Sequence, residues 1–158
     1  MAHWLKKFVA QIDRLISNNK FMALCTAFVL FNACAYFFPA SYWYEIKKIN
    51  IQDSKTGQSI SMVINREINR DFIGTRSVIV RRMSEGTGDI VCADSSLKNY
   101  QVGEKLPANL TLGWWSNGTC VTLDEGAYMV TTIVNISVPS VLQPKTVVYE
   151  SNVFRIEK

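Results

Sequence analysis

The residues best suited to chemistry in this chain are its four cysteines. Cys92 and Cys120 lie in the C-terminal part of the chain, whereas Cys25 and Cys34 lie in an apolar segment near the N-terminus. A structural zinc site needs more ligands than two thiols, and the only histidine, His3, lies far away in the sequence. We therefore expect no metal and no cofactor. A disulfide between Cys92 and Cys120 is expected if this part of the chain is extracytoplasmic, and two ordinary thiols are expected if it is cytoplasmic.

The sequence also lacks the residues of a catalytic pair. A Ser–His or Cys–His pair would need a histidine in the same domain. Carboxylates that could share a proton are scattered along the chain, at Glu67, Asp71, Asp89, Asp94, Asp124 and Glu125. Their spacing matches that of solvated surface charges, and there is no glycine-rich phosphate loop. The sequence predicts that the protein is not an enzyme.

Two groups of residues are candidates for a binding surface. Trp114 and Trp115 are neighbours, and neighbouring residues of a strand point to opposite faces, so one should fill the core while the other is exposed. An exposed tryptophan is a typical interface anchor, although it can also pack under a loop. The second group consists of arginines that would face lipid headgroups or an anionic partner, or else form a solvated sheet face: Arg66, Arg70, Arg76, Arg81 and Arg82.

An apolar segment precedes the region that carries these residues. Residues 21–38 contain no charge, which is close to the length needed to cross a bilayer as a helix. Pro39 ends the regular helix, and Tyr42, Trp43 and Tyr44 are of the aromatic type found at membrane interfaces. We therefore predict a transmembrane signal-anchor helix over residues 21–40.

Residues 1–20 form a basic N-terminal segment. Residues 4–16 place apolar side chains at helical spacing, with Lys6, Lys7 and Arg14 on the polar side, which predicts an amphipathic helix on the membrane surface. The alternatives are an extension of the spanning helix or the basic part of a targeting signal. The positive-inside rule places this segment in the cytoplasm and residues 43–158 outside it. The prediction is thus a single-pass protein of the inner (plasma) membrane with a periplasmic or extracellular domain.

Two other fates of the apolar segment stay open. Ala33, Cys34 and Ala35 form a small-residue pattern of the kind that a signal peptidase cleaves, and Cys34 also resembles the lipidated cysteine of a bacterial lipoprotein. Asn32 is a candidate contact for homo-oligomerisation, because amide side chains hydrogen-bond between helices in membranes, or it is simply a tolerated polar residue.

The domain over residues 43–158 has the pattern of an all-β protein. Segments of period-2 alternation are separated by turn residues, without a helical stretch. We expect about seven strands, with an irregular stretch at 93–106, a strand at 110–114 and a hairpin turn at Asn117-Gly118. This number of strands favours a two-sheet antiparallel β-sandwich over a closed barrel.

One motif refines this prediction. Asp124, Gly126 and Tyr128 form the D-x-G-x-Y pattern, which resembles the corner of immunoglobulin-like domains where the tyrosine hydroxyl bonds back to the backbone. The resemblance implies an immunoglobulin-like sandwich with a structural corner at these residues. The chain departs from the family in its cysteines, which do not occupy the usual inter-sheet positions.

In its organisation, the chain resembles the small membrane-anchored immunoglobulin-like proteins carried by bacterial phages and prophages. This resemblance implies an inner-membrane protein with a periplasmic domain. The domain carries nearly equal numbers of basic and acidic residues, and nucleic acid is not an expected partner because it requires a basic stripe. We expect a membrane-tethered module for protein binding or envelope structure, with the lipid bilayer and another envelope protein as partners. The alternative is a phage-type effector that acts on the membrane, in lysis or superinfection exclusion.

Overall fold

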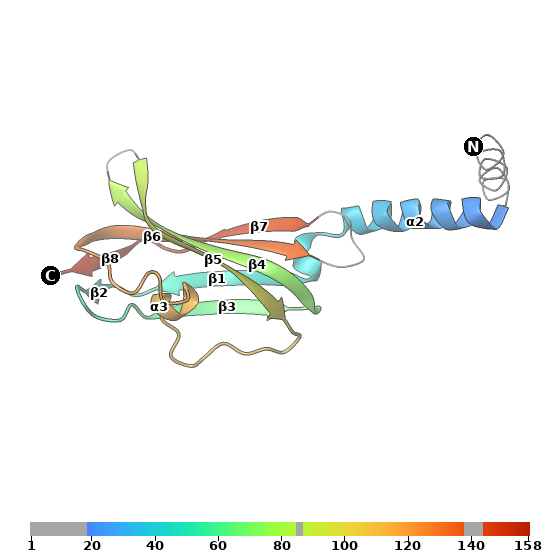
Figure 1. The fold of residues 1–158 in the computed structure, drawn as a ribbon. Coiled ribbons are helices and arrows are strands. Elements are labelled where there is room, and N and C mark those ends of the chain that lie inside the picture. The colour runs from blue at the N-terminus through green and yellow to red at the C-terminus, as the bar shows by residue number, and fades with distance from the viewer. Residues whose placement is uncertain (1–18, 85–86, 138–143) are drawn as a thin grey trace, which may run out of the picture. The chain divides into compact units, whose positions relative to one another are not determined.

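The computed structural model describes residues 19–84, 87–137 and 144–158, and it divides into two compact units. One unit contains the helix α2 (Asn19–Phe37), and the other begins at Pro39 and contains all of the strands (Figure 1). The amphipathic helix predicted over residues 4–16 lies outside the described residues.

Helix α2 coincides with the predicted apolar segment. Its apolar side chains are exposed, with Leu24 at 69% and Val29 at 64%. The amide of Asn32 donates to the backbone oxygen of Phe28 at 2.8 Å. The helix takes in the polar residues Asn19, Lys20 and Asn32. In the part of the chain that the structure describes, no helix is long and apolar enough to cross a membrane, so the transmembrane helix predicted for residues 21–40 is not supported.

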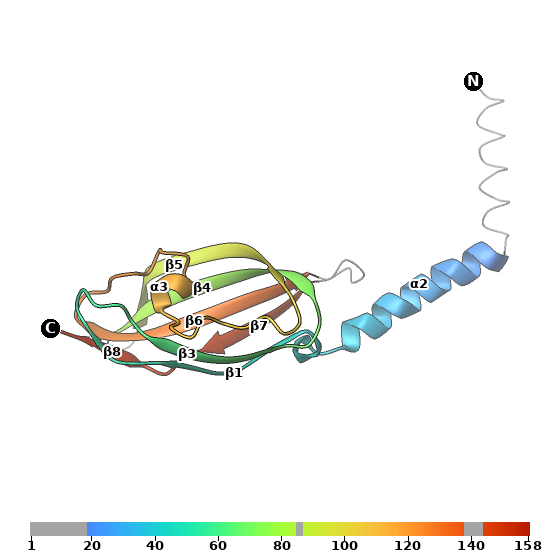
Figure 2. The ribbon, with the colours of Figure 1, turned by 90° about the horizontal axis from the view of Figure 1, so that it is seen from below.

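The second unit is mainly β and contains two sheets, as the sequence predicts. The described residues form eight strands, close to the seven expected. In the small sheet β1 (Tyr44–Ile51) pairs antiparallel with β3 (Met62–Ile68). The large sheet has the order β2-β8-β6-β4-β5, with β7 also paired to β6. Figure 2 shows β5, β4, β6 and β7 of this sheet. Its strands are β2 (Ser54–Lys55), β4 (Phe72–Ser84), β5 (Thr87–Tyr100), β6 (Gly126–Ser137), β7 (Lys145–Glu150) and β8 (Phe154–Glu157).

Strand β6 is central because it pairs on both flanks. On one flank it is antiparallel to β4 over ten pairs of residues, from Arg82↔Tyr128 to Ile73↔Ser137. On the other flank it pairs first with β8 and then with β7, so these two short strands form one broken edge. Strand β2 extends this edge by pairing parallel with β8.

The core lies between the two sheets. Val78 and Val80 of β4 and Val130 and Val134 of β6 are fully buried, because alternate residues of a strand point to the same face. On the small sheet the buried side chains include Tyr44, Ile49, Ile51, Met62 and Ile68.

Two local predictions were wrong. Residues 93–100 are not irregular but belong to β5, because they pair with β4 as far as Phe72↔Tyr100. The strand expected at 110–114 is reduced to one bridge, Ser61↔Thr111.

A short helix, α3 (Leu112–Trp115), follows this bridge, and the hydroxyl of Thr111 caps it by accepting from the Trp114 amide at 3.2 Å. The residues expected to form a hairpin turn instead follow α3. Asn117 and Gly118 both adopt positive φ there, a conformation common where helices end.

Candidate functional site

The predicted disulfide is present between Cys92 of β5 and Cys120. Their Cα atoms are 5.9 Å apart, and the bridge joins residues 28 positions apart in the sequence. It ties β5 to the segment that follows α3. Cys25 and Cys34 of α2 are exposed free thiols.

The residues predicted for the structural corner lie just before and at the start of β6. The Tyr128 hydroxyl donates to the backbone oxygen of Asp124 at 2.8 Å, which is the hydrogen bond that the motif predicts. Arg82 supports the same corner, because its Nη2 donates to the backbone oxygen of Glu125 at 2.6 Å. A β-carbon at Gly126 would lie 3.0 Å from Nε of Arg82. Glycine at this position therefore leaves room for the arginine side chain.

The structure does not gather the predicted arginines into one basic strip. Arg70 lies over the ring of Tyr42 at 4.3 Å, and Arg81 donates to the Thr131 hydroxyl at 3.1 Å. Arg82 belongs to the corner described above. The other two arginines, Arg66 and Arg76, are buried between the sheets.

The two tryptophans differ sharply in exposure. Trp115 is fully buried and its indole N–H donates to the hydroxyl of Thr132 at 3.1 Å, whereas Trp114 is 43% exposed. They lie in α3 and not in a strand, and their rings stack with centroids 6.4 Å apart. The Lys98 ammonium lies 4.8 Å from the centroid of the Trp114 ring.

The interior next to α3 holds a cluster of cationic and aromatic side chains, which we call the arginine–tyrosine cluster: Tyr44, Arg66, Arg76, Lys98 and Tyr100. Arg76 is fully buried, with its guanidinium carbon 4.1 Å from the centroid of the Trp115 ring. Arg66, whose side chain is only 4% exposed, lies 5.8 Å from the centroid of the Tyr100 ring. The Tyr100 ring in turn packs edge-on against Tyr44 at 5.4 Å.

Burial perturbs the ionisation of this cluster. Burial lowers the pKa of Arg76, and the Arg66 charge lowers it further, whereas the nearby hydroxyls of Tyr100 and Tyr44 act against this effect. The pKa of Lys98 is lowered by burial first and then by the positive charge of Arg76. Burial raises the pKa of both tyrosines, which keeps their hydroxyls protonated. The cluster is therefore positively charged and rich in hydrogen-bond donors.

Most of this cluster was missed from the sequence. The signal that would have revealed Arg76 is strand parity, because Arg76 alternates with Val78 and Val80 and so points to the same buried face. Arg66 does stand on the apolar side of its segment in the sequence. Lys98 and Tyr100 carry no comparable signal, because their burial depends on pairing between β4 and β5. The burial of Tyr44 depends on packing of its ring against Phe72 and Tyr100, which are distant in the sequence.

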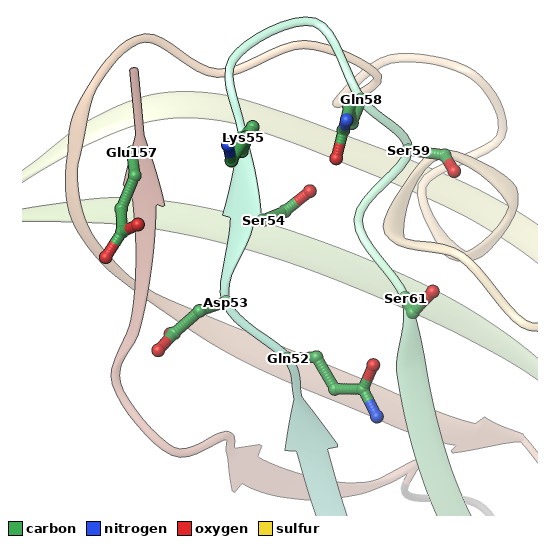
Figure 3. Close-up of a pocket in the computed structure, with 8 residues that line it drawn as sticks. All are labelled: Gln52, Asp53, Ser54, Lys55, Gln58, Ser59, Ser61 and Glu157. Carbon is green, nitrogen blue, oxygen red and sulfur yellow. The ribbon is translucent and has the colours of Figure 1, made fainter.

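A separate polar pocket of about 320 Å³ lies beside β2. It is lined by Gln52, Asp53, Ser54, Lys55, Gln58, Ser59, Ser61 and Glu157 (Figure 3). The carboxylate of Asp53 accepts from the backbone N–H of Arg155 at 2.7 Å. In Figure 3, Ser54 points toward Gln58 and Asp53 points to the opposite side of β2. Hydroxyl and carboxylate groups therefore do not converge here as a nucleophile and base would.

The described residues also contain no group of three His, Cys, Asp or Glu side chains that could hold a metal ion. Comparison of the chain with known protein families, with curated proteins and with solved structures found no match. The function must therefore be argued from the chain's own residues.

Proposed function

We propose that this protein is a non-catalytic binding module: an immunoglobulin-like β-sandwich outside the cytoplasm, held at a membrane by α2, that contacts another envelope protein. The observation that carries this proposal is the disulfide Cys92–Cys120 in a domain that follows an exposed apolar helix in the chain. Disulfides persist in oxidising compartments and are rare in the cytosol.

The strand order supports the immunoglobulin-like assignment. In such sandwiches the last strand pairs with the second-last, which pairs with the third strand of the fold. Here β7 and β8 pair with β6, β6 pairs with β4, and β5 adds a further strand beside β4. The bridge Ser61↔Thr111 extends the sheet of β1 and β3 in the place of a further strand. The bond from Tyr128 to Asp124 adds the tyrosine corner, although the disulfide departs from the usual inter-sheet position.

The surface of α2 supports attachment to a membrane. Leu24, Phe28, Val29, Leu30 and Phe31 are each more than half exposed. Burying one such side chain stabilises a protein by roughly 1.5–3 kcal/mol, so a contiguous apolar surface of this kind marks an interaction site. Lipid acyl chains provide the matching apolar surroundings.

Fractionation and thiol alkylation of the full-length chain test this function. We expect the protein in the membrane fraction, resistant to extraction by high salt, with two of its four cysteines protected from alkylation before reduction. The double variant Leu24→Lys/Val29→Lys should move the protein to the supernatant. The matched control Val148→Lys alters a side chain of β7 that is 57% exposed and should leave the protein in the membrane fraction.

Two results would contradict the proposal. Wild-type protein in the supernatant would contradict attachment to a membrane. Alkylation of all four cysteines before reduction would place the domain in a reducing compartment. The same cells separate the binding module from its alternative, an effector of lysis or superinfection exclusion. Rapid loss of membrane potential on expression would favour the effector, and an intact membrane with a co-purifying envelope protein favours the module.

A further inference from the structure

The arginine–tyrosine cluster brings cationic side chains together from three strands, Arg66 from β3, Arg76 from β4 and Lys98 from β5. We propose that this cluster is a binding site for a small oxyanion, of the class of inorganic phosphate or the phosphate group of a larger ligand. This inference rests on the interior of the β domain and does not depend on attachment to a membrane.

Arg76 is the centre of the proposed site. Its side chain is fully buried, and Trp115 covers one face of the guanidinium group at 4.1 Å. The N–H groups lie in the plane of the guanidinium, and Nε, Nη1 and Nη2 have no hydrogen-bond partner among the described residues. A buried charge is costly unless it is paired and hydrogen-bonded. Arg76 therefore needs acceptor oxygens that the described protein atoms do not supply.

The neighbours of Arg76 add further cationic donors, together with hydroxyl groups that can donate or accept. Nε of Arg66 and the hydroxyls of Tyr100 and Ser96 also lack hydrogen-bond partners in the described part of the chain, and Ser96 lies opposite Arg76 in the pairing of β4 with β5. One carboxylate approaches the group, since Oε1 of Glu104 lies 3.3 Å from Nη2 of Arg66. A ligand that presents several oxygens is the complement of such a set of donors.

The charge of the cluster favours an anionic ligand. Arg66, Arg76 and Lys98 carry three positive charges, and Glu104 offsets one of them. The carboxylate of Asp94 also lies near Arg76 and offsets a second positive charge, and its oxygens accept from Asn117 at 2.7 Å and Thr119 at 3.5 Å. One positive charge remains uncompensated, and an anionic ligand such as phosphate would neutralise it. The charge of Arg76 lowers the pKa of Lys98, and the charge of Arg66 lowers the pKa of Arg76, a repulsion that an anionic ligand would relieve.

The loop over residues 101–110 borders the cluster, because Oε1 of Glu104 lies 3.3 Å from Nη2 of Arg66. Glu104 lies on this loop with 38% of its side chain exposed. Lys98 lies at the edge of the cluster against the exposed ring of Trp114. We infer that the oxyanion displaces the Glu104 carboxylate from Arg66, so that Glu104 acts as an internal competitor.

Thermal unfolding of the full-length protein in detergent micelles tests the site. Inorganic phosphate is titrated against sodium chloride at equal ionic strength and pH. The wild-type Tm should rise saturably with phosphate, because a ligand that binds only the folded state stabilises it. Glu104→Gln, which changes an exposed loop residue, should lower the apparent Kd several-fold. Lys98→Gln and Arg76→Gln should weaken or abolish the rise in Tm with phosphate. The matched control Lys48→Gln changes an exposed lysine of β1 and should behave as the wild type.

The opposite results would overturn the proposal. A Tm that does not differ between phosphate and chloride, in both the wild type and Glu104→Gln, would show that no oxyanion binds. A phosphate-dependent rise in Tm of equal size in the wild type, Lys98→Gln and Arg76→Gln would show that phosphate acts as a general salt and not at this site. Short-chain phosphatidic acid, added below its micellar concentration, identifies the source of the phosphate group. Binding about tenfold tighter than that of inorganic phosphate, a difference of about 1.4 kcal/mol, assigns a lipid headgroup, and equal affinities assign the free ion.

Discussion

Removal of the Cys92–Cys120 disulfide should lower the stability of the β domain by an amount that follows from the length of the loop it closes. The two cysteines are 28 positions apart. In the chain-entropy model a loop of this length restricts the unfolded chain by about 3.5 kcal/mol at 25 °C. Single domains have unfolding free energies of roughly 5–15 kcal/mol, so the double variant Cys92→Ala/Cys120→Ala should lose a quarter or more of its stability. Alanine is preferred to serine because Cys120 is buried and a buried hydroxyl would add its own penalty.

Urea unfolding of the full-length protein in detergent, followed by tryptophan fluorescence, measures this loss. Trp115 is a suitable reporter because it is fully buried in the folded domain. The matched control Cys25→Ala/Cys34→Ala changes two exposed thiols of α2 and should shift the unfolding free energy by less than about 0.5 kcal/mol. A loss below about 1 kcal/mol in the first variant would refute the assumption that the bridge acts on an extended, unconstrained unfolded chain.

Three smaller perturbations test the packing of the β domain. Tyr128→Phe removes the hydroxyl bonded to the Asp124 backbone and should cost about 1 kcal/mol in urea unfolding; no measurable cost would mean that the corner does not stabilise the fold. Trp115→Ala empties a fully buried site and should cost about 3–5 kcal/mol, whereas Trp114→Ala, at an exposed position, should cost far less; equal costs would contradict the observed burial. Burial raises the pKa of Tyr44 above the unfolded value of 10.0. Its contribution to stability is therefore fully present below pH 10.0 and is lost as the pH rises toward the folded pKa. Alkaline unfolding should begin at higher pH in Tyr44→Phe, and an unchanged midpoint would refute this cause.

The features that the sequence predicted correctly depend on local patterns. Alternation along 128–138 identifies β6, because period-2 burial is intrinsic to a strand. The disulfide was predicted because no histidine accompanies Cys92 and Cys120 and because the domain was expected outside the cytoplasm. The corner follows from a motif of five residues that ends at Tyr128.

The features that it missed depend on contacts between distant segments. Residues 93–100 are polar, yet they form an edge strand because β4 supplies partners along their whole length. At 110–114 the alternation favoured a strand, but the Thr111 cap and the residues that follow favoured a helical turn. The prediction that one of Trp114 and Trp115 is buried and the other exposed is correct. The strand from which it was argued is wrong, because both residues lie in α3.

The burial of Arg66 and Arg76 is difficult to explain by stability alone. Replacement of buried ionic groups by apolar residues of similar volume is often neutral or stabilising, so a sandwich core built only for stability would hold aliphatic side chains at these positions. The disulfide lies close to this region in the chain, since Cys92 and Lys98 belong to the same strand and Cys120 follows Trp115 by five positions. It therefore constrains the two segments that supply Lys98 and the aromatic cover of Arg76. A cross-link of about 3.5 kcal/mol offsets part of the cost of burying charge, which is the arrangement expected of a domain that retains a cationic interior for binding.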